Sequence, residues 1–149
     1  MKVANHAEKI TALWTAFLLG TLFHTQLGLM PLFHGQSIVE SAVRTNLDPI
    51  FWGMFFFFVL PTLALIAPTF TENRSVRWGH FWFTVIYSVL NFIHLLADLG
   101  VRPIAWYQIA LMLVLFLIGL VLNVVSYQWA RSRERKRGAI EREPDHATL

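Results

Sequence analysis

Two histidines and an aspartate lie inside long apolar stretches of this chain, at His24, His94 and Asp98. His94 and Asp98 are four residues apart, so a helix would carry both on one face. Ionisable side chains are costly in a bilayer and usually face a cofactor, each other or a water-filled path. Imidazole and carboxylate groups together are typical ligands of copper, iron or zinc. These three residues are therefore our first candidates for chemistry, and His34 is a further candidate metal ligand.

The stretch 77–98 carries a polar stripe along one side. At about 100° per residue, its members fall within roughly a third of the helix circumference: His80, Thr84, Tyr87, Ser88, Asn91, His94 and Asp98. The other sides are apolar, so the stripe is expected to face the interior of a helix bundle. Asn91 lies one turn from His94 and is a candidate for holding its imidazole in place. His80 lies close to Trp78, which predicts that it anchors the headgroup interface.

His24 has a glycine one turn away on either side, Gly20 and Gly28. Such glycines open a groove in a helix surface, which suits a flat macrocycle or a closely packed second helix. Counted from ends on the same side of a membrane, His24 is about 14 residues into its helix and His94 about 17, a difference in height of about 5 Å. The two imidazoles are therefore expected at similar depth, in the outer half of the membrane.

Three chemistries fit these residues. The first is a b-type haem ligated by His24 and His94, with Asn91 or Asp98 fixing an imidazole tautomer. The second is a bare transition metal held by the two histidines and Asp98, with His34 or Glu40 as a further ligand. The third is a proton or quinone path along the polar stripe. A purely structural interpretation, in which these groups form hydrogen bonds between helices, stays open for each residue.

One histidine spacing resembles a known family. The fourteen-residue step from His80 to His94 is similar to the spacing on the haem-carrying helices of the cytochrome b family, where one helix presents ligands to two stacked haems. No partner helix repeats this step, because His24 and His34 are ten residues apart and lie about 80° apart around a helix. The resemblance therefore extends only to a single haem.

The composition predicts the fold class. Of 149 residues, 56% are hydrophobic and 14% charged, which is typical of an integral membrane protein. Each stretch long enough to cross about 30 Å of hydrocarbon is expected to be a helix, because its backbone must be bonded internally. These stretches are 10–33, 49–70, 76–98 and 104–130. We predict an all-α integral membrane protein, a four-transmembrane-helix up-down bundle within residues 1–130, followed by a basic and then polar tail, 131–149, disordered at its end.

The distribution of basic residues predicts the orientation. Ten of the twelve Lys and Arg residues fall on the side that four spans give to both termini, so both termini are expected in the cytoplasm. The basic flank after the last span is expected to contact lipid headgroups and not nucleic acid. The loop 34–48 is expected to form a short interfacial helix that covers the outer end, with Glu40 facing the same cavity. In the last span, Asn123 and Gly119 are expected to make a helix–helix contact.

The chain has no cysteine, which excludes disulfides, thiolate metal sites and iron–sulfur clusters. It also has no phosphate-binding glycine loop and no zinc-protease or nucleophile motif, so no catalytic residue is predicted. We predict a multi-pass membrane protein that binds a b-type haem or a metal and has a redox or electron-transfer role. The alternative is an accessory or assembly subunit of a larger respiratory or photosynthetic membrane complex, without a cofactor, whose partners are other subunits or a second copy.

Overall fold

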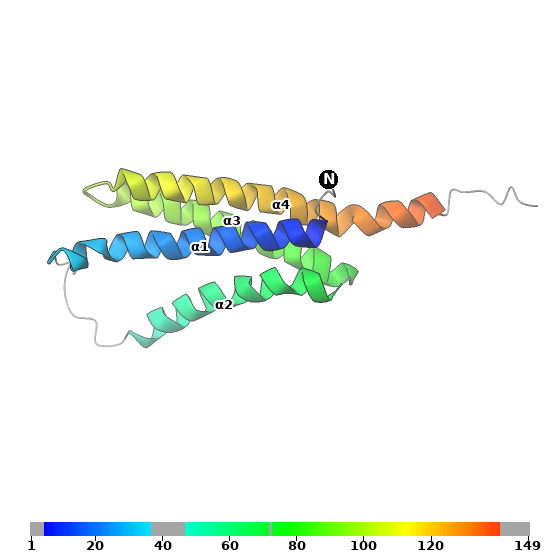
Figure 1. Ribbon diagram of the computed structural model, residues 1–149, viewed down its shortest axis with the longest axis horizontal. Coiled ribbons are helices and arrows are strands. Elements are labelled where there is room, and N and C mark those ends of the chain that lie inside the picture. Colours follow the sequence, from blue (N-terminus) through cyan, green and yellow to red (C-terminus); the bar gives the residue numbers. More distant parts are fainter. Residues whose placement is uncertain (1–4, 37–46, 72, 141–149) are drawn as a thin grey trace, which may run out of the picture.

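The computed structural model describes residues 5–36, 47–71 and 73–140, with side chains to residue 132. The described chain is helical, without strands, as Figure 1 shows. Its helices are α1 (His6–Phe33), α2 (Asp48–Phe70), α3 (Arg74–Gly100) and α4 (Trp106–Ile140). All four contain an apolar stretch long enough to span a membrane, which in α4 is Trp106–Ser132. The helices thus have the length and composition of a multi-pass membrane protein.

The predicted spans agree with the helices to within a few residues, except at the end of α4. There the helix continues to Ile140, ten residues past the predicted end of the span. Arg, Glu and Lys are good helix formers, so a basic tail can extend a helix out of its apolar stretch. The predicted interfacial helix in 34–48, with Glu40, and the predicted disorder at 141–149 fall largely or wholly outside the described residues.

Local sequence signals fix where two helices begin. At the start of α1 the backbone N–H of Glu8 donates to Asn5 Oδ1 (2.9 Å), and the Asn5 N–H donates to Glu8 Oε2 (2.9 Å). This capping box satisfies donors that the first helical turn leaves unpaired. At the start of α3, Asn73 Oδ1 accepts from the backbone N–H of Ser75 at 3.0 Å. Both caps lie at the same end of the bundle as the last turns of α2 (Figure 1).

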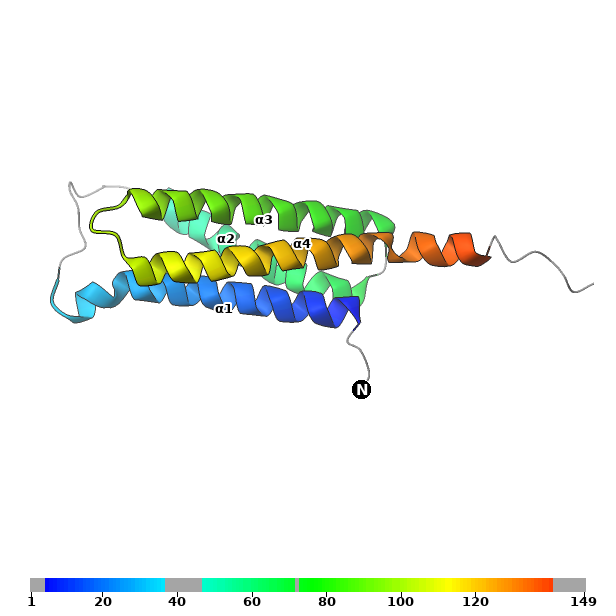
Figure 2. The same cartoon turned by 90° about the horizontal axis from the view of Figure 1, so that it is seen from above.

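Helix α4 packs against both α1 and α3, whereas α2 packs mainly against α1. In Figure 2, α4 lies between α1 and α3. Figure 1 shows the start of α1 beside the point where α4 extends beyond the other helices, and we call this the terminal end. The opposite end, where α1 finishes and α4 begins, is the distal end. Helix α2 diverges from the other helices toward its first residue (Figure 1), and its residues 48–56 are all exposed.

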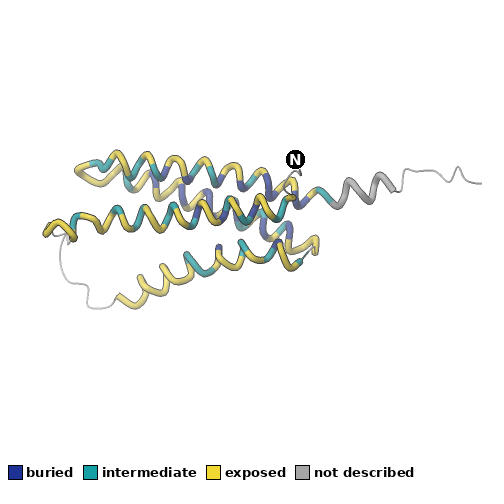
Figure 3. The backbone as a smooth tube through the Cα atoms, in the orientation of Figure 1, coloured by how far each residue is buried: buried dark blue, intermediate teal, exposed yellow. Residues whose placement is uncertain are grey.

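The buried core belongs mainly to α1, α3 and α4. On α1 the buried residues are Ile10, Trp14 and Phe17, all in its first half. On α2 they are two prolines, Pro61 and Pro68. Figure 3 shows most of α2 and the second half of α1 as exposed or half-buried. These exposed surfaces are largely apolar, as expected of helices that face lipid.

The polar stripe of α3 faces the bundle interior over most of its length, as its periodicity predicts. Its residues His80, Thr84, Tyr87, Ser88 and Asn91 are buried. The prediction that His80 anchors the headgroup interface is wrong. Its Nε2 accepts a hydrogen bond from Trp14 Nε1 at 3.1 Å, and its ring lies edge-on to Trp129, with centroids 5.6 Å apart.

The predicted contact in the fourth span is confirmed. Asn123 Nδ2 donates to Ser88 Oγ at 2.9 Å, which links α4 to α3. A Cβ atom at Gly119 would lie 3.0 Å from the same hydroxyl oxygen, so the glycine permits this close approach. Helix–helix hydrogen bonds beside small residues are a common packing device in membranes.

Candidate metal centre

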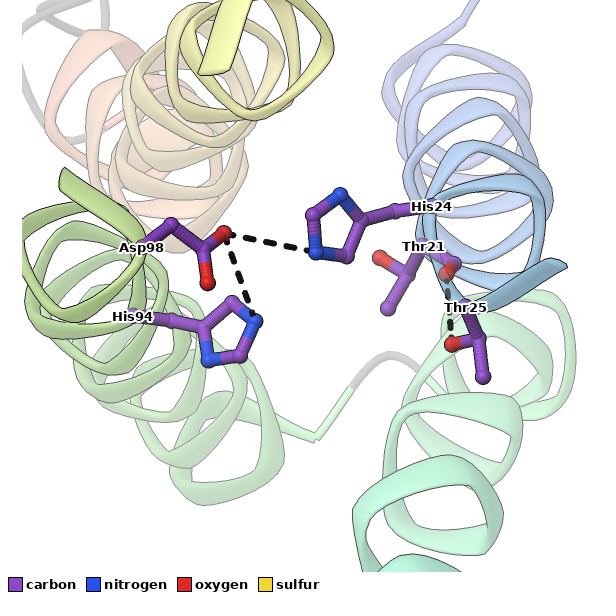
Figure 4. Close-up of polar contacts among 5 residues, drawn as sticks. All are labelled: Thr21, His24, Thr25, His94 and Asp98. Atoms are coloured by element: carbon purple, nitrogen blue, oxygen red, sulfur yellow. Dashed lines mark hydrogen bonds and ion pairs between the residues drawn. The ribbon is translucent and has the colours of Figure 1, made fainter. Parts of the chain in front are cut away.

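Helices α1 and α3 bring His24, His94 and Asp98 together toward the distal end. Figure 4 shows His24 projecting from α1 toward Asp98 of α3, with His94 beside it on the same helix. His24 Nε2 lies 3.4 Å from Asp98 Oδ2, and His94 Nε2 lies 3.8 Å from the same oxygen. The imidazole centroids are 5.4 Å apart with an interplanar angle of 81°. One ligand atom from each of the three residues lies within 4.8 Å of the others.

These distances are close to those of a metal-ligand set. Two ligand atoms that each lie about 2.0–2.1 Å from a tetrahedral zinc ion are about 3.3 Å from each other. The separations of 3.4 and 3.8 Å between Asp98 Oδ2 and the two imidazoles exceed this value slightly, and all the ligand atoms lie within 4.8 Å of one another, so side-chain rotations would be needed to bring them to bonding distance. The group can therefore hold a metal ion. Three protein ligands would leave at least one coordination position for water or another molecule.

Two buried polar atoms of the group lack hydrogen-bond partners among the described residues, namely Asp98 Oδ2 and His24 Nδ1. The side chains of His24 and Asp98 are only 12% and 19% exposed, so water makes up little of the cost of these missing hydrogen bonds. A cation at Asp98 Oδ2 would satisfy that oxygen directly. The donor set fits a bound ion, and so does the absence of a hydrogen bond to this oxygen from the described part of the chain.

The group is open on one side. The His94 side chain is 56% exposed, in contrast to the other two ligands. Residues 47–56, which form the start of α2, are also all exposed. Access to the group is therefore from the side of His94.

The other predicted ligand, His34, lies apart from the group. It is exposed at the C-terminal cap of α1. His34 is therefore not part of the cluster of His24, His94 and Asp98. Asn91 is buried on the inner face of α3, and its Oδ1 has no hydrogen-bond partner in the described chain.

The two glycines beside His24 face α4. A Cβ at Gly20 would lie 2.3 Å from Leu115 Cδ2, so the side chain of Leu115 fills the space that a macrocycle would need. A Cβ at Gly28 would lie 3.8 Å from the side-chain nitrogen of Gln108. Of the two uses predicted for these glycines, the structure favours close helix packing.

Sequence reasoning missed one buried charge, Arg77. This residue is only 3% exposed, and its Nη2 donates to the carbonyl oxygen of Trp129 and to Ser132 Oγ. In the sequence it contributes only as one of the ten basic residues that predict the orientation. The signal was present, because Arg77 lies three residues before His80 and so extends the polar stripe by one turn.

Comparisons with known proteins add no family. No family model, no curated protein and no solved structure matches the chain. The structure itself defines the class as an all-helical protein with four candidate membrane spans and a His24/His94/Asp98 group able to hold a metal.

Proposed function

We propose that this multi-pass membrane protein binds one transition-metal ion through His24, His94 and Asp98. The observation that carries the proposal is the position of Asp98 Oδ2, which lies 3.4 Å and 3.8 Å from the two imidazole Nε2 atoms. Imidazole and carboxylate ligands suit copper, iron or zinc. With copper or iron, the open side at His94 would let the site exchange electrons or bind a small ligand, which gives the protein a redox role.

A bare ion fits better than a b-type haem. Two axial imidazoles must approach a haem iron from opposite faces of the macrocycle. Here the carboxylate oxygen of Asp98 is within 4 Å of both Nε2 atoms, and Leu115 occupies the space beside Gly20. A haem would have to displace both groups.

We further propose an up-down bundle with both termini in the cytoplasm. The ten-to-two division of basic residues supports this orientation. The metal site then lies in the outer half of the bilayer, because it is near the distal end. Copper, iron or zinc would reach it from the outer side.

Metal analysis of the purified protein tests the proposal. The full-length chain, purified in detergent without a metal-affinity step and incubated with each metal, should retain about one equivalent of one of them after gel filtration. His24→Ala and Asp98→Asn should each abolish this retention. His34→Ala is the matched control and should retain the ion.

An absorption spectrum distinguishes the remaining alternatives. A Soret band in the wild-type spectrum that is absent from His24→Ala would mean that the site binds haem and not a bare ion. A colourless protein that retains no ion contradicts the proposal and favours the accessory-subunit alternative.

A further inference from the structure

A cavity of about 1200 Å³ lies at the terminal end, far from the candidate metal group. It is formed by the first turns of α1, the last turns of α2, the start of α3 and the end of the apolar part of α4. Its polar lining includes His6, Glu8, Thr11, Thr69, Arg77 and Ser132. This volume exceeds the usual range of small-molecule sites, which is about 300–1,000 Å³.

Arg77 places a positive charge in the lining of the cavity. Arginine side chains near the end of a membrane helix usually extend to the aqueous interface, but this one is 97% buried. Its guanidinium is held by the Trp129 carbonyl and Ser132 Oγ, and its Cζ lies 5.3 Å from the centre of the Trp129 ring. Arginine held in this way is well suited to bind a phosphate group.

Two other charged residues among those described lie at or near the cavity, namely Lys9 and Glu8. Lys9 and Arg77 both lie close enough to His6 to interact with it electrostatically. Glu8 is the acidic residue of the lining, and its two carboxylate oxygens accept hydrogen bonds from the backbone N–H and the side-chain amide of Asn5. The carboxylate is thus engaged in the cap of α1.

The lining is also partly apolar, since Ala12, Pro68 and Trp129 contribute to it. A ligand with an anionic head and an apolar part would match both kinds of wall. Basic pockets between transmembrane helices on the basic side of a membrane protein are known to bind lipid headgroups. We propose that this cavity binds an anionic phosphate ester, the head of an anionic lipid or a soluble phosphate compound, with Arg77 as its anchor.

Thermal unfolding of the full-length chain in a nonionic detergent tests this site. The probes are short-chain phosphatidylglycerol, phosphatidylcholine of the same chain length, and inorganic phosphate. Phosphatidylglycerol should raise the unfolding temperature saturably, and phosphatidylcholine should not. If inorganic phosphate does the same, the ligand is a soluble phosphate compound, and if it does not, the ligand is a lipid. Equal effects of the two lipids would overturn the proposal.

Three variants locate the site. Arg77→Gln should weaken phosphatidylglycerol binding about tenfold, because it removes a charge-assisted contact. Arg131→Gln is the matched control, since this exposed arginine binds Tyr127 at the same end but does not line the cavity, and it should leave the affinity unchanged. An equal loss of affinity in both variants would mean that the lipid responds to the overall surface charge and not to a site at Arg77, which would overturn the proposal.

Glu8→Gln keeps the proposal testable if Arg77→Gln does not fold. Glutamine can replace glutamate in a capping box, so α1 keeps its first turn. Removal of the negative charge from the lining should tighten phosphatidylglycerol binding about threefold. An unchanged or weaker affinity in this variant would contradict an anion site.

Discussion

The two ends of the bundle use polar side chains in different ways. At the terminal end, Trp14 and His80 form a hydrogen bond inside an aromatic core, and both residues are at most 6% exposed. Toward the distal end, His24 and Asp98 are partly exposed and His94 is 56% exposed. The buried residues of α1 stop at Phe17, before His24 is reached. The terminal end thus stabilises the bundle, while the distal end leaves ionisable groups accessible for a ligand.

Replacement of Trp14 should have the largest effect on stability. Trp14 is completely buried and lies edge-on to Phe17 and Tyr87. Trp14→Ala should lower the free energy of unfolding in detergent by about 3 kcal/mol or more, because it creates a cavity and removes the donor to His80. Chemical unfolding followed by circular dichroism measures this loss.

The matched control for that prediction is Trp82→Ala. Trp82 is 60% exposed, and its removal should change the free energy of unfolding by no more than about 0.5 kcal/mol. Similar losses in the two variants would mean that the burial of Trp14 in the aromatic core has no special role in stability.

Replacement of Gly20 should have a smaller effect on stability, and it should also affect the metal site. Gly20→Ala places a Cβ against the buried side chain of Leu115 and should destabilise the protein by about 1–3 kcal/mol. Because Gly20 is one turn from His24, the resulting shift of α1 should also weaken metal binding. Isothermal titration with the retained metal measures that second effect.

Gly79→Ala is the control for Gly20→Ala, because it changes the helix propensity without a change in helix packing. A Cβ at Gly79 meets no atom within 4 Å, so this substitution should be neutral or stabilise α3 by about 0.5–1 kcal/mol. Metal affinity should not change. A comparable destabilisation by both glycine substitutions would argue against the close contact of α1 with α4.

The smallest effect concerns the hydrogen bond between Asn123 and Ser88. A double-mutant cycle with Asn123→Ala and Ser88→Ala should give a coupling energy of about 0.6 kcal/mol, which is the average for such bonds between membrane helices. Unfolding measurements on the four proteins of the cycle provide this value. A coupling above about 2 kcal/mol would show that this contact is a main determinant of the bundle, contrary to the role we assign to the aromatic core.

The helices and the inner face of α3 follow from the sequence. A membrane-spanning stretch must satisfy its own backbone, so hydropathy and length locate the helices to within a few residues. The stripe containing Thr84, Ser88 and Asn91 is periodic, and periodicity determines which face of a helix turns inward. The same reasoning and a count of depth brought His24 and His94 together as candidates.

Other features depend on how the helices pack, and the sequence carries little information about them. Helix α2 is apolar on all sides, so nothing in its pattern predicts that it diverges toward its first residue. The burial of His80 and Arg77 depends on the positions of Trp14 and Trp129 on two other helices. Positional rules for interface residues predicted the opposite environment for His80, because they describe average depth and not the partners of an individual side chain.

The ligand set of the proposed metal centre can be observed directly by electron paramagnetic resonance of the protein loaded with one equivalent of Cu²⁺. We expect nitrogen hyperfine coupling from two imidazoles in the wild-type spectrum. His24→Ala and His94→Ala should each reduce the coupling to one nitrogen or abolish binding, whereas His34→Ala should leave the spectrum unchanged. A spectrum without nitrogen coupling, or one that neither His24→Ala nor His94→Ala alters, would rule out the two histidines as ligands.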